Sequence, residues 1–223
     1  MLSHHNTKRL TITSVMLALS TAIAFICGFI PFLSLPFGGG FTLGSMLPII
    51  VISYMYGVKW GFTASGIYAL IQIALDLLMG KGSVILPLFM PSDEGYMGLT
   101  AAIAILVLDY LCAYTVLGIG GIFRRAVKKK ALALTLGVLL ALSLRYLFHV
   151  LSGYVFYGAW AEWFFSQEGF YAIGEWILGA FSGKTLALIY SVFYNGTYML
   201  PEIVITAVIA PAVARIPRIR AEG

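Results

Sequence analysis

The sequence predicts an all-α membrane protein, and three observations support this fold class. Its 223 residues are 61% hydrophobic and only 10% charged. About six apolar segments follow one another along the chain, most of them close to or longer than the length of about 20 residues that crosses a bilayer. Positive charge lies in every second connection between them. A soluble domain of this size does not need so much apolar sequence, so residues 1–223 are expected to form a single integral membrane domain.

The first three predicted transmembrane helices occupy the N-terminal part of the chain. The first runs from about Leu10 to Ile30 and is expected to be retained, because it is longer than the apolar core of a signal peptide. A proline- and glycine-rich loop, PFLSLPFGGGF (31–41), follows it. The second helix is predicted from about Thr42 to Tyr56 and the third from about Gly61 to Met79.

Three more helices are predicted, from about Gly98 to Phe123, Ala131 to Tyr157 and Thr185 to Ala214. The connection between the fifth and sixth, Gly158 to Lys184, is rich in aromatic residues. Tryptophan and tyrosine gather at the level of the lipid headgroups. This connection is therefore predicted to be an interfacial segment on the outer face, with a lid over a binding site as the alternative.

The charges between the segments predict the orientation. Basic residues lie in alternate connections and at both ends: Lys8, Arg9, Lys59, the run RRAVKKK (124–130), Arg215, Arg218 and Arg220. The other connections are neutral or acidic, as at Glu162, Glu168 and Glu175. By the positive-inside rule, both termini are predicted to be cytoplasmic in a multi-pass protein of the cell membrane. This pattern accounts for the net charge of +5, so nucleic-acid binding is not predicted.

Several kinds of functional site are missing from the sequence. No glycine-rich phosphate loop ending in Gly-Lys-Ser or Gly-Lys-Thr is present, so the chain carries no ATPase of that kind. Cys27 and Cys112 both lie in apolar runs and are expected to be buried thiols. The histidines His4, His5 and His149 do not have the spacing of metal ligands, so neither a metal nor a cofactor is expected.

Asp109 is the most informative single residue. It is the only charged residue between Gly98 and Phe123 and lies near the middle of that segment. A carboxylate at the centre of a bilayer costs about 2.5–3.5 kcal/mol on insertion scales. Such a residue usually faces the protein interior and serves a function.

A few other polar residues lie within the predicted helices: Tyr110, Arg145, His149, Tyr190, Asn195, Tyr198 and Glu202. Helical spacing places the last three on one face, and Arg145 and His149 share another. These groups should converge on a cavity, or else form an internal network that only holds helices together. A cavity with a carboxylate, an imidazole, a carboxamide and several tyrosines would suit a flat, cationic ligand.

Two further patterns each allow more than one interpretation. Ser65 and His149 could form the dyad of an intramembrane hydrolase, but no G-x-S-x-G motif supports this remote alternative. Ser14, Ala18 and Ala22 recur every four residues in the first helix, which lets another helix approach closely. That helix could belong to this chain or to a partner membrane protein.

Four stretches carry a resemblance to a known family: LDYLCAY (108–114), RYLFHVLSGYVFYG (145–158), IYSVFYNGTYMLPE (189–202) and PFGGGFTLGSMLPI (36–49). Together they resemble the thiamine-specific substrate-binding subunit, or S-component, of energy-coupling factor transporters. The resemblance covers most of the chain. The His-x3-Gly and Tyr-x4-Asn patterns, in that order, are its most specific features.

The resemblance implies roles for individual residues. The implied ligand-binding residues are Asp109, Tyr110, His149, Tyr157, Tyr190, Asn195 and Tyr68. Ser14 and Ala18 match the small-residue motif by which such subunits meet a transmembrane coupling protein, and Ala22 continues that stripe. Gly38 to Gly40 stand where some members have a tryptophan.

The function implied by the resemblance is thiamine binding for uptake, without enzymatic activity. A transmembrane coupling protein and a pair of cytoplasmic ATPases would drive transport, and the first loop would close over the bound vitamin. The alternative within the same class is a subunit for a thiamine precursor or another small water-soluble vitamin.

Overall fold

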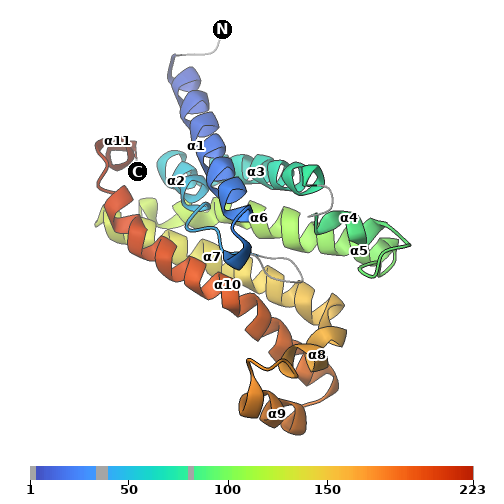
Figure 1. Cartoon of the computed structure of the whole chain (residues 1–223). Coiled ribbons are helices and arrows are strands. Elements are labelled where there is room, and N and C mark those ends of the chain that lie inside the picture. Colours follow the sequence, from blue (N-terminus) through green and yellow to red (C-terminus); the bar gives the residue numbers. More distant parts are fainter. Residues whose placement is uncertain (1–3, 34–39, 80–82, 223) are drawn as a thin grey trace.

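The computed structural model describes residues 4–33, 40–79 and 83–222, and the regular elements in these ranges are all helical (Figure 1). The predicted all-α fold class is therefore confirmed. Residues 34–39, which include Gly38 and Gly39 of the first loop, lie outside the described residues, so the expected loop closure stays a prediction.

Five helices of the described chain are long and apolar enough to cross a membrane: α1 (His4–Gly28), α3 (Val58–Leu78), the composite helix Leu99–Arg124, α7 (Lys130–Phe156) and α10 (Gly183–Val213). A sixth apolar helix, α2 (Leu47–Tyr56), is shorter. The short elements are η1 (Pro31–Leu33), α4 (Ile85–Phe89), η5 (Gly158–Trp160), α8 (Ala161–Phe165), α9 (Tyr171–Ala180) and α11 (Pro217–Glu222).

Helix α2 begins five residues later than the sequence predicts, at Leu47 rather than Thr42. The residues before it form a turn in which Leu43 and Gly44 have φ of 51° and 82°, which no α-helix accommodates. Ten residues of helix rise only about 15 Å, so α2 alone does not cross a bilayer. Every residue from Leu47 to Met55 is buried, which places α2 at the centre of the core.

Glycines allow the central helices to approach closely. The Ser53 hydroxyl donates to the Gly118 carbonyl over 2.5 Å and accepts the Gly121 N–H over 2.9 Å, which joins α2 to the composite helix. A Cβ on Gly137 of α7 would lie only 1.9 Å from the carbonyl oxygen of Gly120. The composite helix and α7 can therefore pack this tightly only with glycine at position 137.

The composite helix Leu99–Arg124 changes its winding along its length. It consists of α5 (Leu99–Ile105), a π-helical segment η3 (Leu106–Cys112), the turn α6 (Ala113–Thr115) and a 3₁₀ segment η4 (Val116–Arg124). Asp109 lies in the π-helical segment. Such segments are rare and occur often at functional sites, because they redirect side chains within a helix.

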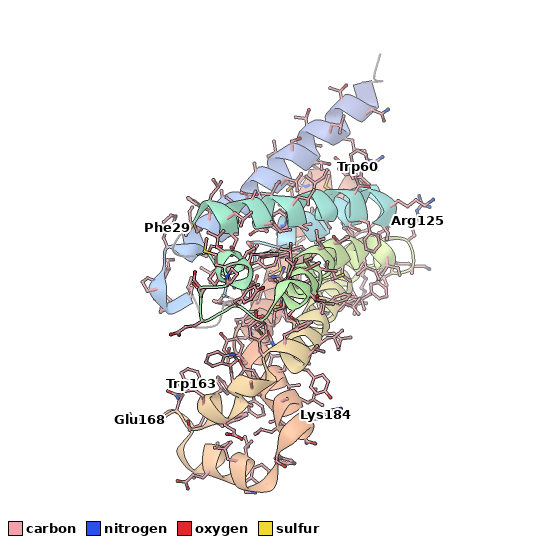
Figure 2. The ribbon with its side chains drawn as sticks, turned by 90° about the vertical axis from the view of Figure 1, so that its right-hand side faces the viewer. Phe29, Trp60, Arg125, Trp163, Glu168 and Lys184 are labelled. Atoms are coloured by element: carbon pink, nitrogen blue, oxygen red, sulfur yellow. The ribbon has the colours of Figure 1, made fainter. Side chains whose placement is uncertain are left out.

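Helices α7 and α10 lie side by side and antiparallel, and the aromatic connection forms the hairpin α8–α9 at their shared end (Figure 1). Trp163 and Glu168 of this hairpin lie at the opposite end of the molecule from Trp60 and Arg125 (Figure 2). The hairpin is thus remote from the basic connection between η4 and α7, as an interfacial segment on the outer face would be.

Candidate ligand-binding cavity

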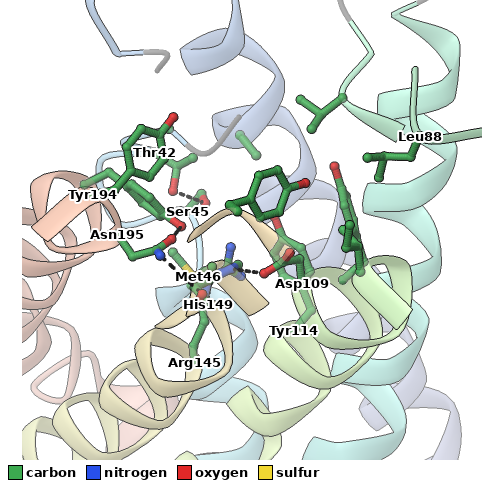
Figure 3. A pocket seen from close by; sticks show the side chains of 18 of the residues that line it. Thr42, Ser45, Met46, Leu88, Asp109, Tyr114, Arg145, His149, Tyr194 and Asn195 are labelled. Carbon is green, nitrogen blue, oxygen red and sulfur yellow. Dashed lines mark hydrogen bonds and ion pairs between the residues drawn. The ribbon is translucent and has the colours of Figure 1, made fainter. Parts of the chain in front are cut away.

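A cavity of about 160 Å³ lies between the turn before α2, α4, η3, α7 and α10 in the described part of the chain (Figure 3). Its lining includes most of the residues that the sequence predicts for ligand binding: Asp109, Tyr110, His149, Tyr157, Tyr190 and Asn195. They come from the composite helix, from α7 and the residue that follows it, and from α10. The polar groups therefore converge on one space, as an inward-facing set within a membrane should.

Asp109 is held by two neighbours on α7. Its Oδ1 lies 2.8 Å from His149 Nδ1, and its Oδ2 accepts the Ser152 hydroxyl over 2.5 Å. The carboxylate favours a proton on Nδ1, which leaves Nε2 as an acceptor when the imidazole is neutral. Nε2 is buried and has no hydrogen-bond partner among the described residues. Ser152 lies three residues after His149 and so shares its face of α7. This spacing could have indicated from the sequence that Ser152 belongs to the site.

Asn195 is oriented by neighbours on both helices of the α7–α10 pair. Its Nδ2 donates to the carbonyls of Ser191 over 2.9 Å and of His149 over 3.2 Å. Its Oδ1 accepts the Tyr198 hydroxyl over 2.6 Å, and the Tyr198 ring meets the His149 ring edge-on at 5.9 Å. The carboxamide and the imidazole are therefore fixed relative to each other.

Tyr110 connects the cavity wall to an acid that sequence reasoning missed. Its hydroxyl donates to Asp76 Oδ2 over 2.9 Å, so its oxygen lone pairs stay available to a ligand donor. Asp76 also accepts the Val84 N–H over 3.2 Å, the Ile85 N–H over 3.0 Å and the Ser83 hydroxyl. It thereby fixes the start of α4, from which Val84 and Leu88 line the cavity.

Tyr157, Tyr190 and Tyr194 form a second aromatic wall. Tyr190 and Tyr194 lie 5.6 Å apart, and Phe164 of the hairpin packs edge-on against them at 5.3 and 5.6 Å. Burial, reinforced by the negative charge of Asp109, raises the pKa of Tyr157 above its ordinary value. Its phenol therefore keeps its proton and can donate a hydrogen bond.

Arg145 and Tyr114 close the inner part of the cavity, and Tyr68 stands behind them. The Arg145 guanidinium lies 3.9 Å from the centroid of the Tyr114 ring, a cation–π contact. Tyr68 is fully buried, meets the Tyr114 ring edge-on at 5.4 Å, and is not among the residues that line the cavity. Its position implies support of Tyr114 rather than direct contact with a ligand.

The predicted docking residues and the hydrolase serine lie away from this cavity. Ser14, Ala18 and Ala22 are all exposed on α1. Ser65 is fully buried on α3 and is not among the cavity-lining residues, so the described structure does not bring it into the site with His149.

Comparison with known proteins assigns the family. The family model described as "Thiamine transporter protein (Thia_YuaJ)" matches residues 14–166. The thiamine transporter ThiT of Bacillus subtilis (strain 168) is 31% identical over 215 residues, which cover 92% of this chain and 91% of that protein. A solved structure of ThiT from Listeria monocytogenes shares the fold, with a TM-score of 0.59 at 19% identity, over 95% of this chain and 98% of that one. The chain therefore belongs to the thiamine transporter family, as a multi-pass protein of the bacterial cell membrane and not an enzyme.

Proposed function

We propose that this chain is a high-affinity thiamine-binding membrane subunit that captures the vitamin from the outer face for uptake. The observation that carries the proposal is the position of Asp109 on a cavity lined by tyrosines. Among the described residues that line the cavity, Asp109 is the only acidic one, and 18% of its side chain is exposed.

The chemistry of thiamine matches this arrangement. Its thiazolium ring is cationic, and its aminopyrimidine ring is flat with donors and acceptors on its edge. The Asp109 carboxylate can balance the positive charge or pair with the aminopyrimidine edge, because two hydrogen bonds leave it further acceptor sites. The tyrosine rings can stack on either ring of the ligand. His149 Nε2 and the Tyr110 oxygen supply directional acceptors.

Transport itself would need partners. We expect a transmembrane coupling protein and a pair of cytoplasmic ATPases to drive movement of the loaded subunit, since the sequence contains no phosphate-binding loop. The exposed stripe Ser14, Ala18 and Ala22 supports this expectation, because small residues let a partner helix approach closely.

Titration calorimetry of thiamine into the purified protein tests the proposal. We expect saturable binding well below micromolar ligand. Asp109→Asn should weaken binding at least about tenfold, because a buried cation beside a neutral amide loses its charge pairing. Asp93→Asn, at an exposed acid in the loop before α5, is the matched control and should leave affinity unchanged.

Two results would contradict the proposal in different ways. Absence of binding at micromolar thiamine would refute the thiamine assignment. Unchanged affinity in Asp109→Asn would leave thiamine as the ligand but make Asp109 a structural residue. Competition with the isolated aminopyrimidine precursor and with other water-soluble vitamins tests the alternative: tighter binding of any of them would reassign the ligand.

A further inference from the structure

Glu202 is a buried acid on α10 that does not line the cavity. Only 1% of the residue is exposed. It follows the cavity residues Asn195 and Tyr198 on the same helix, so its spacing alone suggests a third ligand contact. The structure instead directs its carboxylate to the polypeptide backbone before α2.

The carboxylate of Glu202 accepts two backbone N–H groups, one on each oxygen. Oε2 lies 2.9 Å from the Thr42 nitrogen, and Oε1 lies 2.8 Å from the Gly44 nitrogen. The Thr206 hydroxyl is a weaker third partner at 3.5 Å. Hydrogen bonds to a charged acceptor are stronger than neutral ones, and two of them fix the direction as well as the distance of the bound segment.

The bound segment is a strained turn. Leu43, between the two bound amides, has a φ of 51°, and among the described residues it is the only one other than glycine with positive φ. This conformation is unfavourable for a bulky side chain, because its Cβ comes too close to the following carbonyl oxygen. A turn of this kind persists only where its surroundings hold it, and the Glu202 carboxylate does so on both sides of Leu43.

The same turn supplies part of the cavity wall. Thr42, Ser45 and Met46 line the cavity, and the Ser45 hydroxyl donates to the Thr42 hydroxyl over 2.8 Å (Figure 3). We propose that Glu202 is a positioning residue of the ligand site: it holds the turn Thr42–Met46 in the shape that completes the cavity, without touching the ligand. This inference rests on the proposed thiamine-binding function.

Glu202→Gln tests this role, because it keeps the size of the side chain but turns one acceptor into a donor facing a backbone N–H. Thr206→Val is the matched control, since it removes only the weak third contact. We expect thiamine affinity to fall at least about tenfold in Glu202→Gln and to stay within about twofold of wild type in Thr206→Val.

Hydrogen–deuterium exchange of the ligand-free proteins provides a local readout. The Thr42 and Gly44 amides should exchange at least about tenfold faster in Glu202→Gln than in wild type, while the amides of α7 should not change. Unchanged exchange at these two amides, or wild-type affinity in Glu202→Gln, would overturn the role of Glu202. Failure of thiamine to bind the wild type would instead overturn the proposed function, because the exchange measurement uses no ligand.

Gly44→Ala keeps the inference testable if Glu202→Gln does not fold. A Cβ at Gly44 would have ordinary contacts, at 3.7 Å from Thr206 Oγ1 and 3.9 Å from Ile209 Cδ1, so the substitution acts through its φ of 82°. It should disturb the turn while Glu202 stays in place and should weaken thiamine binding in the same direction. Wild-type affinity in a folded Gly44→Ala protein would overturn the inference.

Discussion

Three acids lie within or near the apolar helices and differ in what they bind: Asp109, Asp76 and Glu202. Asp109 faces the cavity and is held by side chains of α7. Asp76 and Glu202 bind backbone N–H groups of segments that supply cavity walls. One acid is thus placed to meet a ligand, and two shape the walls around it.

Asp76→Asn is predicted to weaken thiamine binding about threefold to tenfold. Its Oδ2 accepts both the Tyr110 hydroxyl and the Val84 N–H, and an amide nitrogen at that position could accept neither. The start of α4 and the Tyr110 ring should then become less ordered. Calorimetry measures the effect, with Asp93→Asn as the control of the same chemistry. Equal affinity in the two variants would show that α4 does not need this contact.

Residue types and helical spacing explain why Asp109, His149 and Asn195 could be predicted and Asp76 could not. A lone charge in the middle of an apolar segment, or a polar face within one, is visible in the sequence. Asp76 lies two residues before the end of α3, where a charge is ordinary. The bonds from Glu202 reach residues 158 and 160 positions away along the chain, and no local pattern encodes such a pairing.

At the scale of elements, the apolar character and length of the segments predicted the helices, but not their internal irregularities. Helix α2 begins after a turn whose Thr42 and Gly44 N–H groups donate to Glu202, and not where the apolar run begins near Thr42. The π-helical segment around Asp109 packs against α3 and α7, and the sequence of η3 does not reveal its winding. At the start of α2 and in η3, tertiary contacts override the local helix propensity, and both features border the cavity.

The hairpin α8–α9 connects to the site through Phe164. We predict that Phe164→Leu lowers the stability of the protein by about 1–2 kcal/mol, because the edge-on contacts with Tyr190 and Tyr194 are lost. The two cavity tyrosines should become more mobile, and thiamine affinity should fall about threefold to tenfold.

Thermal unfolding in detergent and calorimetry measure these two effects. Phe62→Leu is the matched control, because Phe62 is exposed on α3 and away from the cavity. If Phe164→Leu loses stability but keeps wild-type affinity, the hairpin supports the fold alone. If it loses neither, the aromatic contacts contribute little.

At the scale of the whole molecule, the alternation of charge predicts how the chain crosses the membrane. The five long helices alone give an odd number of membrane crossings. The number is even only if α2, together with the turn before it, also crosses the membrane. The basic connection near Arg125 and the hairpin at Glu168 lie at opposite ends of the molecule (Figure 2). This arrangement supports cytoplasmic termini and an outer hairpin.

Cysteine labelling in intact cells tests this orientation. In a background with Cys27→Ala and Cys112→Ala, the near-isosteric Ser166→Cys should react with a membrane-impermeant maleimide, because Ser166 is exposed in the outer hairpin. Ala126→Cys keeps every charge of the basic connection and should react only after the cells are permeabilised. The reverse pattern would invert the topology and place the hairpin in the cytoplasm. Labelling of both sites in intact cells would mean an even number of crossings between them, and α7, the long helix that separates them, would then not cross the membrane.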